Sequence, residues 1–329
     1  MKHPPYHLRA NKAVDRFLLV ELLRSVGENF GPISDFTYYG FGGPFLEDLK
    51  LLDEYLPEVR LVSIEASTHT RQRQELHRFS SRLRLIPGTM DDFLTHDYAP
   101  GKRDIFWLDY TDLKYSRIQE FQRVIGLVPL DSIVRITLRA EIDYAPSRYE
   151  PFLNSEEFRR LLEGIQQEFE RVFGKVLGNK AEEMIHDRDK FPSIVLSMLR
   201  EAAEDITRDA GDREFLPFHT ICYEDQTQML TLTGMVVGRN MSQSVAERFT
   251  SAKFATFDWS TIQHIELPVL SLREVMKLAP LLPDKQRSGD ELWNALGYNI
   301  ADKRKRSEVA LENYGLFHRY HPQFARTIL

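Results

Sequence analysis

Residues 37–46 read TYYGFGGPFL, and much of the fold can be worked out from this segment. It begins as a short β-type run, ends in glycines, and passes into a helix-like segment, PFLEDLKLLDEYL, that opens at Pro44. Gly40, Gly42 and Gly43 let the backbone turn tightly and approach a ligand without a Cβ in the way. The start of the following helix would offer free N–H groups to that ligand. The spacing G-x-G-G is shorter than the dinucleotide fingerprint G-x-G-x-x-G, and an ordinary strand-to-helix turn would also explain it.

Outward from this segment, apolar runs alternate with helix-like segments. The β-type runs are RLVSIEA (60–66), LRLIPG (83–88), DIFWLDY (104–110) and DSIVRITLRAE (131–141). The helix-like segments between them are THTRQRQELHRF (68–79), MDDFLTHD (90–97) and SRIQEFQRVIGLV (116–128). This alternation indicates parallel βαβ units, and mostly apolar runs fit strands covered on both faces. We therefore expect an α/β fold with a Rossmann-like, doubly wound and mostly parallel sheet.

The same patterns divide the chain into five parts. An N-terminal helical segment (1–30), with a helix over 12–26 that Gly27 and the Gly31–Pro32 pair close, precedes a Rossmann-like core (31–142). A helical insertion (143–212) follows, with helices expected over 150–174 and 193–209. Two β-type runs form a hairpin (213–240) that finishes the sheet antiparallel, and a C-terminal helical extension (241–329) completes the chain.

Acidic residues follow the second and third of these runs. Glu65 ends the second run about 20 residues after the glycines, where a carboxylate can accept both ribose hydroxyls of a nucleoside. The alternative is an acid that caps the next helix near Thr68. After the third run, Asp91 or Asp92 can accept a hydrogen bond from an adenine amino group. An ordinary helix start with an acidic first turn explains these two equally well.

The fourth run ends in the sequence Asp-Tyr-Thr-Asp. Ligands of open α/β sheets bind beyond the carboxyl ends of the strands, so Asp109, Tyr110 and Asp112 lie where reacting groups belong. A polar strand-to-helix loop is the plainer explanation. Asp109 with Asp112 could also hold Mg²⁺, but we expect no metal, and no His/Cys/carboxylate spacing indicates zinc.

In the order glycine loop, acid, acid and Asp-aromatic, the chain resembles class I methyltransferases that use S-adenosylmethionine (SAM), and the group of putative O-methyltransferases among them. The resemblance covers roughly residues 30–140 and the hairpin. It implies SAM as the cofactor, with the methionine moiety over the glycine loop, the ribose at the second strand, adenine at the third and the methyl group at the fourth. The implied binding residues are Tyr39, Gly40, Phe41, Gly42, Gly43, Glu65, Ala66, Asp91, Asp92 and Asp109.

Two positions depart from the family pattern. The family usually has an acid two residues before the first glycine, and this chain has Tyr38 there. The fourth motif also differs from the Asn/Asp-Pro-Pro-aromatic of DNA enzymes that methylate amino groups, which argues against nucleobase N-methylation.

Polar residues outside the core could complete the site. Lys12 lies on the polar face of the N-terminal helix and can pair with the methionine carboxylate, or simply face solvent. Residues 318–321, His-Arg-Tyr-His, form a polar-aromatic cluster that an ordinary surface or packing role explains, and the C-terminal region as a whole could bind a protein partner.

The composition argues against a general nucleic-acid-binding protein, a disulfide-linked protein and a membrane-spanning protein. The 329 residues are 42% hydrophobic and carry 43 basic against 49 acidic residues, a net charge of −6 that does not support broad nucleic-acid binding. The single cysteine, Cys222, cannot form an internal disulfide. We expect a cytoplasmic protein without a signal peptide or a membrane-spanning run.

Together these features predict a SAM-dependent methyltransferase that methylates an oxygen of an unidentified acceptor. Asp109 or Asp112 is the candidate base, and Tyr110 would shape the pocket. Two alternatives stay open. The fold can serve as a non-catalytic module that binds SAM or another adenosine compound, or as a scaffold for a partner. A nicotinamide-dependent oxidoreductase is disfavoured because the second half of the dinucleotide fingerprint is missing.

Overall fold

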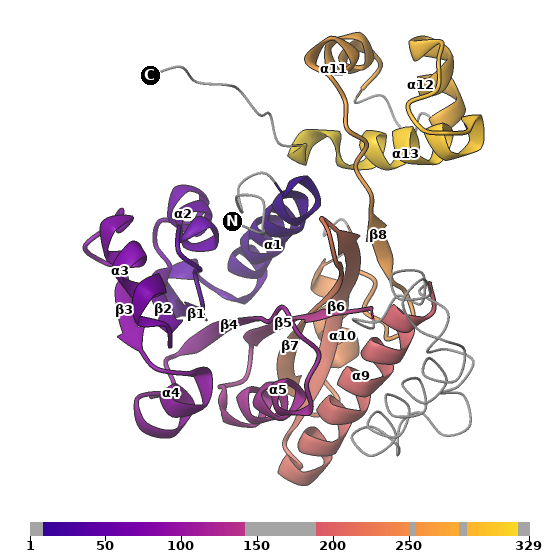
Figure 1. The fold of residues 1–329 in the computed structure, drawn as a ribbon. Coiled ribbons are helices and arrows are strands. Elements are labelled where there is room, and N and C mark those ends of the chain that lie inside the picture. Colours follow the sequence, from indigo (N-terminus) through magenta and orange to yellow (C-terminus); the bar gives the residue numbers. More distant parts are fainter. Residues whose placement is uncertain (1–8, 142–188, 250–253, 283–287, 322–329) are drawn as a thin grey trace, which may run out of the picture. The chain divides into compact units, whose positions relative to one another are not determined.

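The computed structural model describes residues 9–141, 189–249, 254–282 and 288–321 (Figure 1). The helix expected over 150–174 lies outside these ranges. The chain divides into two units. One comprises Met1–Leu19, Tyr223–Gln226 and His264–Leu329, and we call it the helical unit; the other comprises Val20–Cys222 and Thr227–Gln263, and we call it the sheet unit.

An eight-stranded sheet with strand order β3-β2-β1-β4-β5-β7-β6-β8 dominates the structure. Strands β3, β2, β1, β4 and β5 pair in parallel, and β7 pairs antiparallel with β5. The strands are β1 (Phe36–Gly40), β2 (Arg60–Glu65), β3 (Arg84–Pro87), β4 (Arg103–Asp109), β5 (Ser132–Arg139), β6 (Arg213–Glu224), β7 (Gln228–Gly238) and β8 (Gln263–Ile265). The predicted Rossmann-like sheet with an antiparallel end is therefore confirmed. The three-residue strand β8 was not foreseen.

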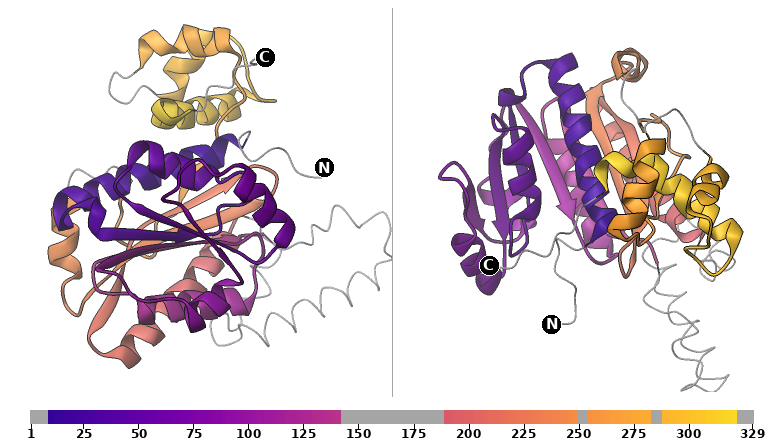
Figure 2. Two further views of the ribbon diagram at one scale, coloured as in Figure 1. Left: turned by 90° about the vertical axis from the view of Figure 1, so that its left-hand side faces the viewer. Right: turned by 90° about the horizontal axis from the view of Figure 1, so that it is seen from above.

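Helices cover both faces of the sheet (Figure 2). They are α1 (Ala10–Phe30), α2 (Glu47–Tyr55), α3 (Thr68–Leu76), α4 (Met90–His96), α5 (Tyr115–Leu127), α9 (Phe191–Ala210) and α10 (Ser242–Ala246). Two predicted boundaries were wrong. Helix α1 continues past Gly27 to Phe30, directly before the Gly31–Pro32 pair, and α2 begins at Glu47 rather than at Pro44. The later start has a backbone cause, since Gly42, Gly43 and Leu46 have φ values of 65°, 54° and 58°, outside the helical region.

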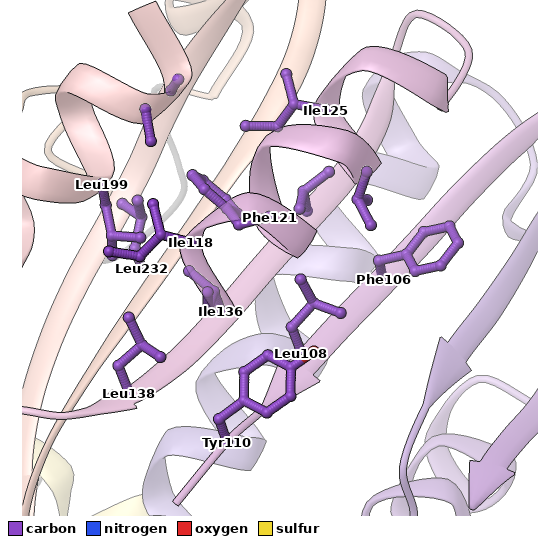
Figure 3. Close-up of a cluster of buried hydrophobic side chains, with 14 of the residues drawn as sticks. Phe106, Leu108, Tyr110, Ile118, Phe121, Ile125, Ile136, Leu138, Leu199 and Leu232 are labelled. Carbon is purple, nitrogen blue, oxygen red and sulfur yellow. The ribbon is translucent and has the colours of Figure 1, made fainter. Parts of the chain in front are cut away.

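One face of the sheet is apolar. Because side chains alternate along a strand, Phe106 and Leu108 of β4 point to the same face as Ile136 of β5, and they pack against α5 and α9 (Figure 3). Phe121 of α5 and Leu199 of α9 lie in this cluster and are fully buried. Each such side chain contributes about 1.5–3 kcal/mol by leaving water, so this layer fixes the sheet against its helices.

The opposite face carries a buried polar row, formed by Trp107, Arg135, Thr137, Thr231 and Thr233. Arg135 donates to Thr233 Oγ1 (2.7 Å), and its guanidinium lies 4.4 Å from the centre of the Trp107 ring. Trp107 Nε1 donates to Thr137 Oγ1 (3.0 Å). Buried polar groups need such partners, and this row supplies them from neighbouring strands.

The described part of the helical unit contains α11 (Leu272–Leu278), α12 (Gly289–Leu296) and α13 (Arg304–Phe317). Leu278, Leu292 and Leu311 form the centre of its small core. No helix in the described ranges is both long enough and apolar enough to cross a membrane.

Two glycines of the sheet unit provide a matched test of the packing. A Cβ at Gly234 would lie 2.4 Å from the Phe215 ring and 2.6 Å from the Leu216 carbonyl oxygen, whereas a Cβ at Gly27 would meet nothing closer than 3.6 Å. We expect Gly234→Ala to lower the free energy of unfolding by about 1–3 kcal/mol through overpacking. Gly27→Ala should raise it by about 0.5–1 kcal/mol because the site is helical. Denaturant titration measures both, and a Gly234→Ala protein as stable as the wild type would contradict the close packing of β6 on β7.

Candidate active site

The candidate site lies at the carboxyl edge of the sheet unit. Gly40 at the end of β1 is in register with Ser63 of β2 and Trp107 of β4, and Glu65 is in register with Pro87 of β3. The glycine turn, Glu65 and Asp109 therefore follow neighbouring strands at one edge. The strand order also reverses between β1 and β4, which is where ligands of such sheets bind.

The two central glycines of the turn face different surroundings. A Cβ at Gly42 would lie 2.6 Å from Leu49 Cδ1 and 2.9 Å from Ser63 Oγ, so this position is closed by the protein. A Cβ at Gly43 would have no atom within 4 Å. Both residues have left-handed φ values, which favour glycine. The turn is thus packed on one side at Gly42 and open at Gly43.

Tyr38 and Tyr39 project to opposite faces of β1. Tyr38 is buried, and its hydroxyl lies 2.6 Å from where a Cβ of Gly40 would be, so its ring fills the space beside the first glycine. Tyr39 packs in the apolar core, with its ring centre 4.7 Å from that of Phe106. Burial and the charge of Asp104 raise the pKa of Tyr39. Its side chain therefore serves the core, which leaves its backbone as the part that could meet a ligand.

Glu65 is held in the loop after β2 by one of its two carboxylate oxygens. Oε1 accepts a hydrogen bond from the Ser67 backbone N–H (2.8 Å), and Ser67 in turn caps α3 by accepting from the Thr70 N–H. Oε2 has no hydrogen-bond partner among the described residues. Ala66, next to it, is exposed. Glu65 thus stabilises the loop and still presents a carboxylate oxygen at the edge of the sheet.

Asp91 and Asp92 lie in the first turn of α4, and both carboxylates are engaged. Asp92 accepts hydrogen bonds from the Thr89 hydroxyl and backbone N–H in a capping box, and these bonds lower its pKa. Asp91 forms an ion pair with Arg123 of α5. The structure therefore contains the helix start that the sequence left open as an alternative, and an adenine contact from either residue stays a prediction.

Tyr110 points away from Asp109, into the apolar side of the sheet. Its hydroxyl donates to a Glu120 carboxylate oxygen, and the Arg117 guanidinium lies 4.3 Å from its ring centre. Burial and Glu120 raise the pKa of Tyr110 far above its ordinary value. The Phe41 ring lies 5.1 Å away, centre to centre. Tyr110 therefore stays protonated and connects the glycine turn to α5 as a packing residue.

Asp112 is half-buried and ion-paired. Lys114 Nζ lies 2.6 Å and Arg117 Nε 3.3 Å from its carboxylate oxygens. Partial burial raises its pKa, but the hydrogen bond from Lys114 and the charge of Arg117 outweigh that effect, so the pKa is lowered. A carboxylate stabilised in this way is a weak base. Asp112 is therefore poorly suited to accept a proton.

Lys12 belongs to the helical unit, where it is buried. Its backbone N–H and that of Asn11 donate to the Asp225 carboxylate, at 2.8 and 3.1 Å, and so cap α1. Its pairing with a methionine carboxylate stays a prediction. In the same unit, the residue 318–321 cluster packs internally, with Tyr320 stacked on Phe17 and His321 against Tyr314. A partner at this surface likewise stays a prediction.

Sequence reasoning missed two side chains that hold the glycine turn. Gln74 of α3 donates from Nε2 to the carbonyl oxygens of Phe41 (3.0 Å) and Gly43 (2.9 Å), and Ser63 Oγ donates to the Phe41 oxygen (3.1 Å). Both residues are fully buried. The one sequence signal was a glutamine within a helix of mostly charged and polar residues, and this pattern gives no sign that Gln74 is buried.

A pocket of about 560 Å³ lies at the opposite, amino edge of the sheet, between the end of α9 and the start of β6. Arg213 and Arg239 contribute to its wall. Arg213 donates to the carbonyl oxygens of Ile125, Gly126 and Val128 at the end of α5, and Arg239 donates to that of Thr207 in α9. These guanidinium groups therefore serve as helix caps.

Several solved structures resemble this chain at low identity. One is the plantazolicin methyltransferase BpumL in complex with SAH, at 13% identity, a TM-score of 0.40, and coverage of 68% of this chain and 85% of that one. A second is an O-methyltransferase family protein from Burkholderia thailandensis, with 13% identity, a TM-score of 0.35, and coverage of 70% and 57%. A third is the pyocyanin biosynthetic protein PhzM, with 15% identity, a TM-score of 0.31, and coverage of 64% and 54%. At these scores the likeness carries no argument about function.

No curated protein matches the chain. A family model described as "Putative O-methyltransferase" does, over residues 4–329, which is nearly the full length. The chain therefore belongs to this family of O-methyltransferases.

Proposed function

We propose that the protein transfers the methyl group of SAM to an oxygen of an acceptor molecule, in the cytoplasm. Membership of the O-methyltransferase family supports the reaction class. The observation that carries the site assignment is the pairing of an open glycine turn at Gly43 with a Glu65 carboxylate oxygen that has no hydrogen-bond partner among the residues that the structure describes. A carboxylate only accepts hydrogen bonds, so it suits the two hydroxyl donors of a ribose.

In this proposal the residues at the carboxyl edge of the sheet bind different parts of SAM. The backbone of Gly42 and Gly43 lies under the methionine moiety, and Glu65 Oε2 accepts from the ribose. When bound, SAM supplies an activated methyl group on a sulfonium. The protein's share of the work is to hold the acceptor oxygen in line with that group and to exclude water.

Asp109 is our candidate for the base that removes a proton from the acceptor hydroxyl. It ends β4 beside the reversal of strand order, and its register partner is Thr137 of β5. Tyr110, fixed by Glu120 and Arg117, supports the loop from the core side. An acceptor that is already ionised would need no such base, so the effect of Asp109 on rate reports on the acceptor as well.

A second candidate function rests on Tyr38. Its ring fills the space beside Gly40, at the position where class I methyltransferases usually have an acid. This favours a non-catalytic module that binds SAM as a ligand only. Calorimetry with SAM, followed by a methyl-release assay with a mixture of hydroxyl-bearing acceptors, separates the two: binding with turnover supports the enzyme, and binding without turnover supports the module.

Removal of the Glu65 carboxylate should weaken SAM binding. We expect Glu65→Gln to raise the Kd for SAM roughly 10- to 100-fold, because a hydrogen bond to a charged group contributes about 1.5–3 kcal/mol. Isothermal titration calorimetry measures the change. Glu75→Gln is the matched control, since Glu75 lies on the adjacent helix α3 and forms an ion pair with the exposed Arg78. A Glu65→Gln protein with wild-type affinity would refute the ribose assignment.

The two acids of the fourth motif should behave differently. We expect Asp109→Asn to lower kcat about 100-fold by removing the base. Asp112→Asn should change kcat only a few-fold, because Asp112 is occupied by Lys114 and Arg117. Single-turnover measurements at saturating SAM test this. If Asp112→Asn proves the more damaging of the two, the base has been misassigned.

A further inference from the structure

The glycine turn is shaped by a side chain from another element. The Gln74 side-chain nitrogen, which has two N–H donors, bonds the Phe41 and Gly43 carbonyl oxygens at 3.0 and 2.9 Å. Ser63 Oγ bonds the same Phe41 oxygen from β2. Two of the turn's carbonyl groups are thus directed into the protein interior by fully buried partners.

This arrangement leaves one polar atom unsatisfied. Gln74 Oε1 is buried and has no hydrogen-bond partner among the described residues. A flipped amide would place this oxygen against the two carbonyl oxygens, so the hydrogen bonds fix its orientation. A buried acceptor without a partner destabilises the fold, and an apolar residue of the same size would avoid this cost. A glutamine at this position is therefore less stable than an apolar residue as a packing group, but it supplies two N–H donors to the glycine turn.

The direction of the Phe41 carbonyl determines the direction of the next amide. In a trans peptide the C=O and the following N–H point in opposite directions. Because Gln74 and Ser63 hold the Phe41 oxygen inward, the Gly42 N–H points away from them. The Gly43 carbonyl is likewise held by Gln74, while the space where a Cβ of Gly43 would stand remains open.

Helix α3 also connects the two halves of the candidate site. Its N-cap, Ser67, donates its backbone N–H to Glu65, and its residue Gln74 holds the glycine turn. Glu65 would contact the adenosine half of SAM and the turn the amino-acid half. Removal of the Gln74 amide should therefore weaken binding of the amino-acid half of SAM and leave binding of the adenosine half unchanged.

We propose that Gln74 is a positioning residue for cosubstrate binding: it holds the glycine turn so that the Gly42 amide faces the amino-acid end of SAM. This inference rests on the proposed function. It predicts that a change at Gln74 weakens the binding of ligands that possess the amino-acid group and spares ligands that lack it. A merely structural role of Gln74 would not produce this selectivity.

The test compares two ligands on Gln74→Met, which keeps the size of the side chain and removes both donors. S-adenosylhomocysteine carries the amino-acid group, and 5′-methylthioadenosine lacks it. By calorimetry, we expect the Kd for S-adenosylhomocysteine to rise roughly tenfold, with the Kd for 5′-methylthioadenosine unchanged. Gln122→Met is the matched control, because Gln122 Nε2 also donates to a backbone carbonyl, that of Ala202, away from the turn.

Ser63→Ala provides a second, smaller change at the same carbonyl. Ser63→Ala should also raise the Kd for S-adenosylhomocysteine selectively. In the double variant with Gln74→Met, the two changes in binding free energy should not add, because both side chains act on one peptide group. Equal weakening for both ligands, or no weakening in either variant, would overturn the proposal. A wild-type protein that binds neither ligand would instead overturn the proposed function.

Discussion

The parallel pairing of β1 with both β2 and β4 is the constraint on which the rest of the site depends. It places the carboxyl ends of these strands at one edge of the sheet. Because the strand order reverses at β1, strands β2 and β3 lie on one side of β1, and β4 and β5 lie on the other. Residues far apart in sequence, such as Gly43, Glu65 and Asp109, therefore come to the same edge of the sheet. The loops beyond that edge need only local contacts to take their shapes.

Side chains alternate between the two faces along each strand, so residues that pack against the helices are separated from residues on the polar face. Tyr39, Phe106 and Tyr110 point to the apolar face and fix the helices, while Tyr38, Trp107 and Asp109 point to the polar face. Neighbours in sequence thus serve opposite layers. The pairs Tyr38–Tyr39 and Asp109–Tyr110 illustrate this, since one member of each lies in the core and the other faces the polar side.

The sheet and its order of elements could be predicted from the sequence because apolar runs and helix-like segments alternate clearly there. The functional detail could not. Asp92 and Asp112 are acids at plausible positions, but their partners Thr89, Lys114 and Arg117 are set by local turn geometry that a spacing pattern does not contain. Gln74 was missed for a different reason. Its burial arises from the packing of α3 beneath the glycine turn, and nothing in a polar helical sequence reveals which residue turns inward.

The buried polar row of β4, β5 and β7 has a consequence for how the chain folds. Displacement of β5 by one residue would turn Arg135 into the apolar layer, away from Thr233 and Trp107. A buried guanidinium deprived of its partners costs several kcal/mol. The row therefore discriminates against misaligned sheets, and the correct alignment is the one that brings the glycine turn to its place.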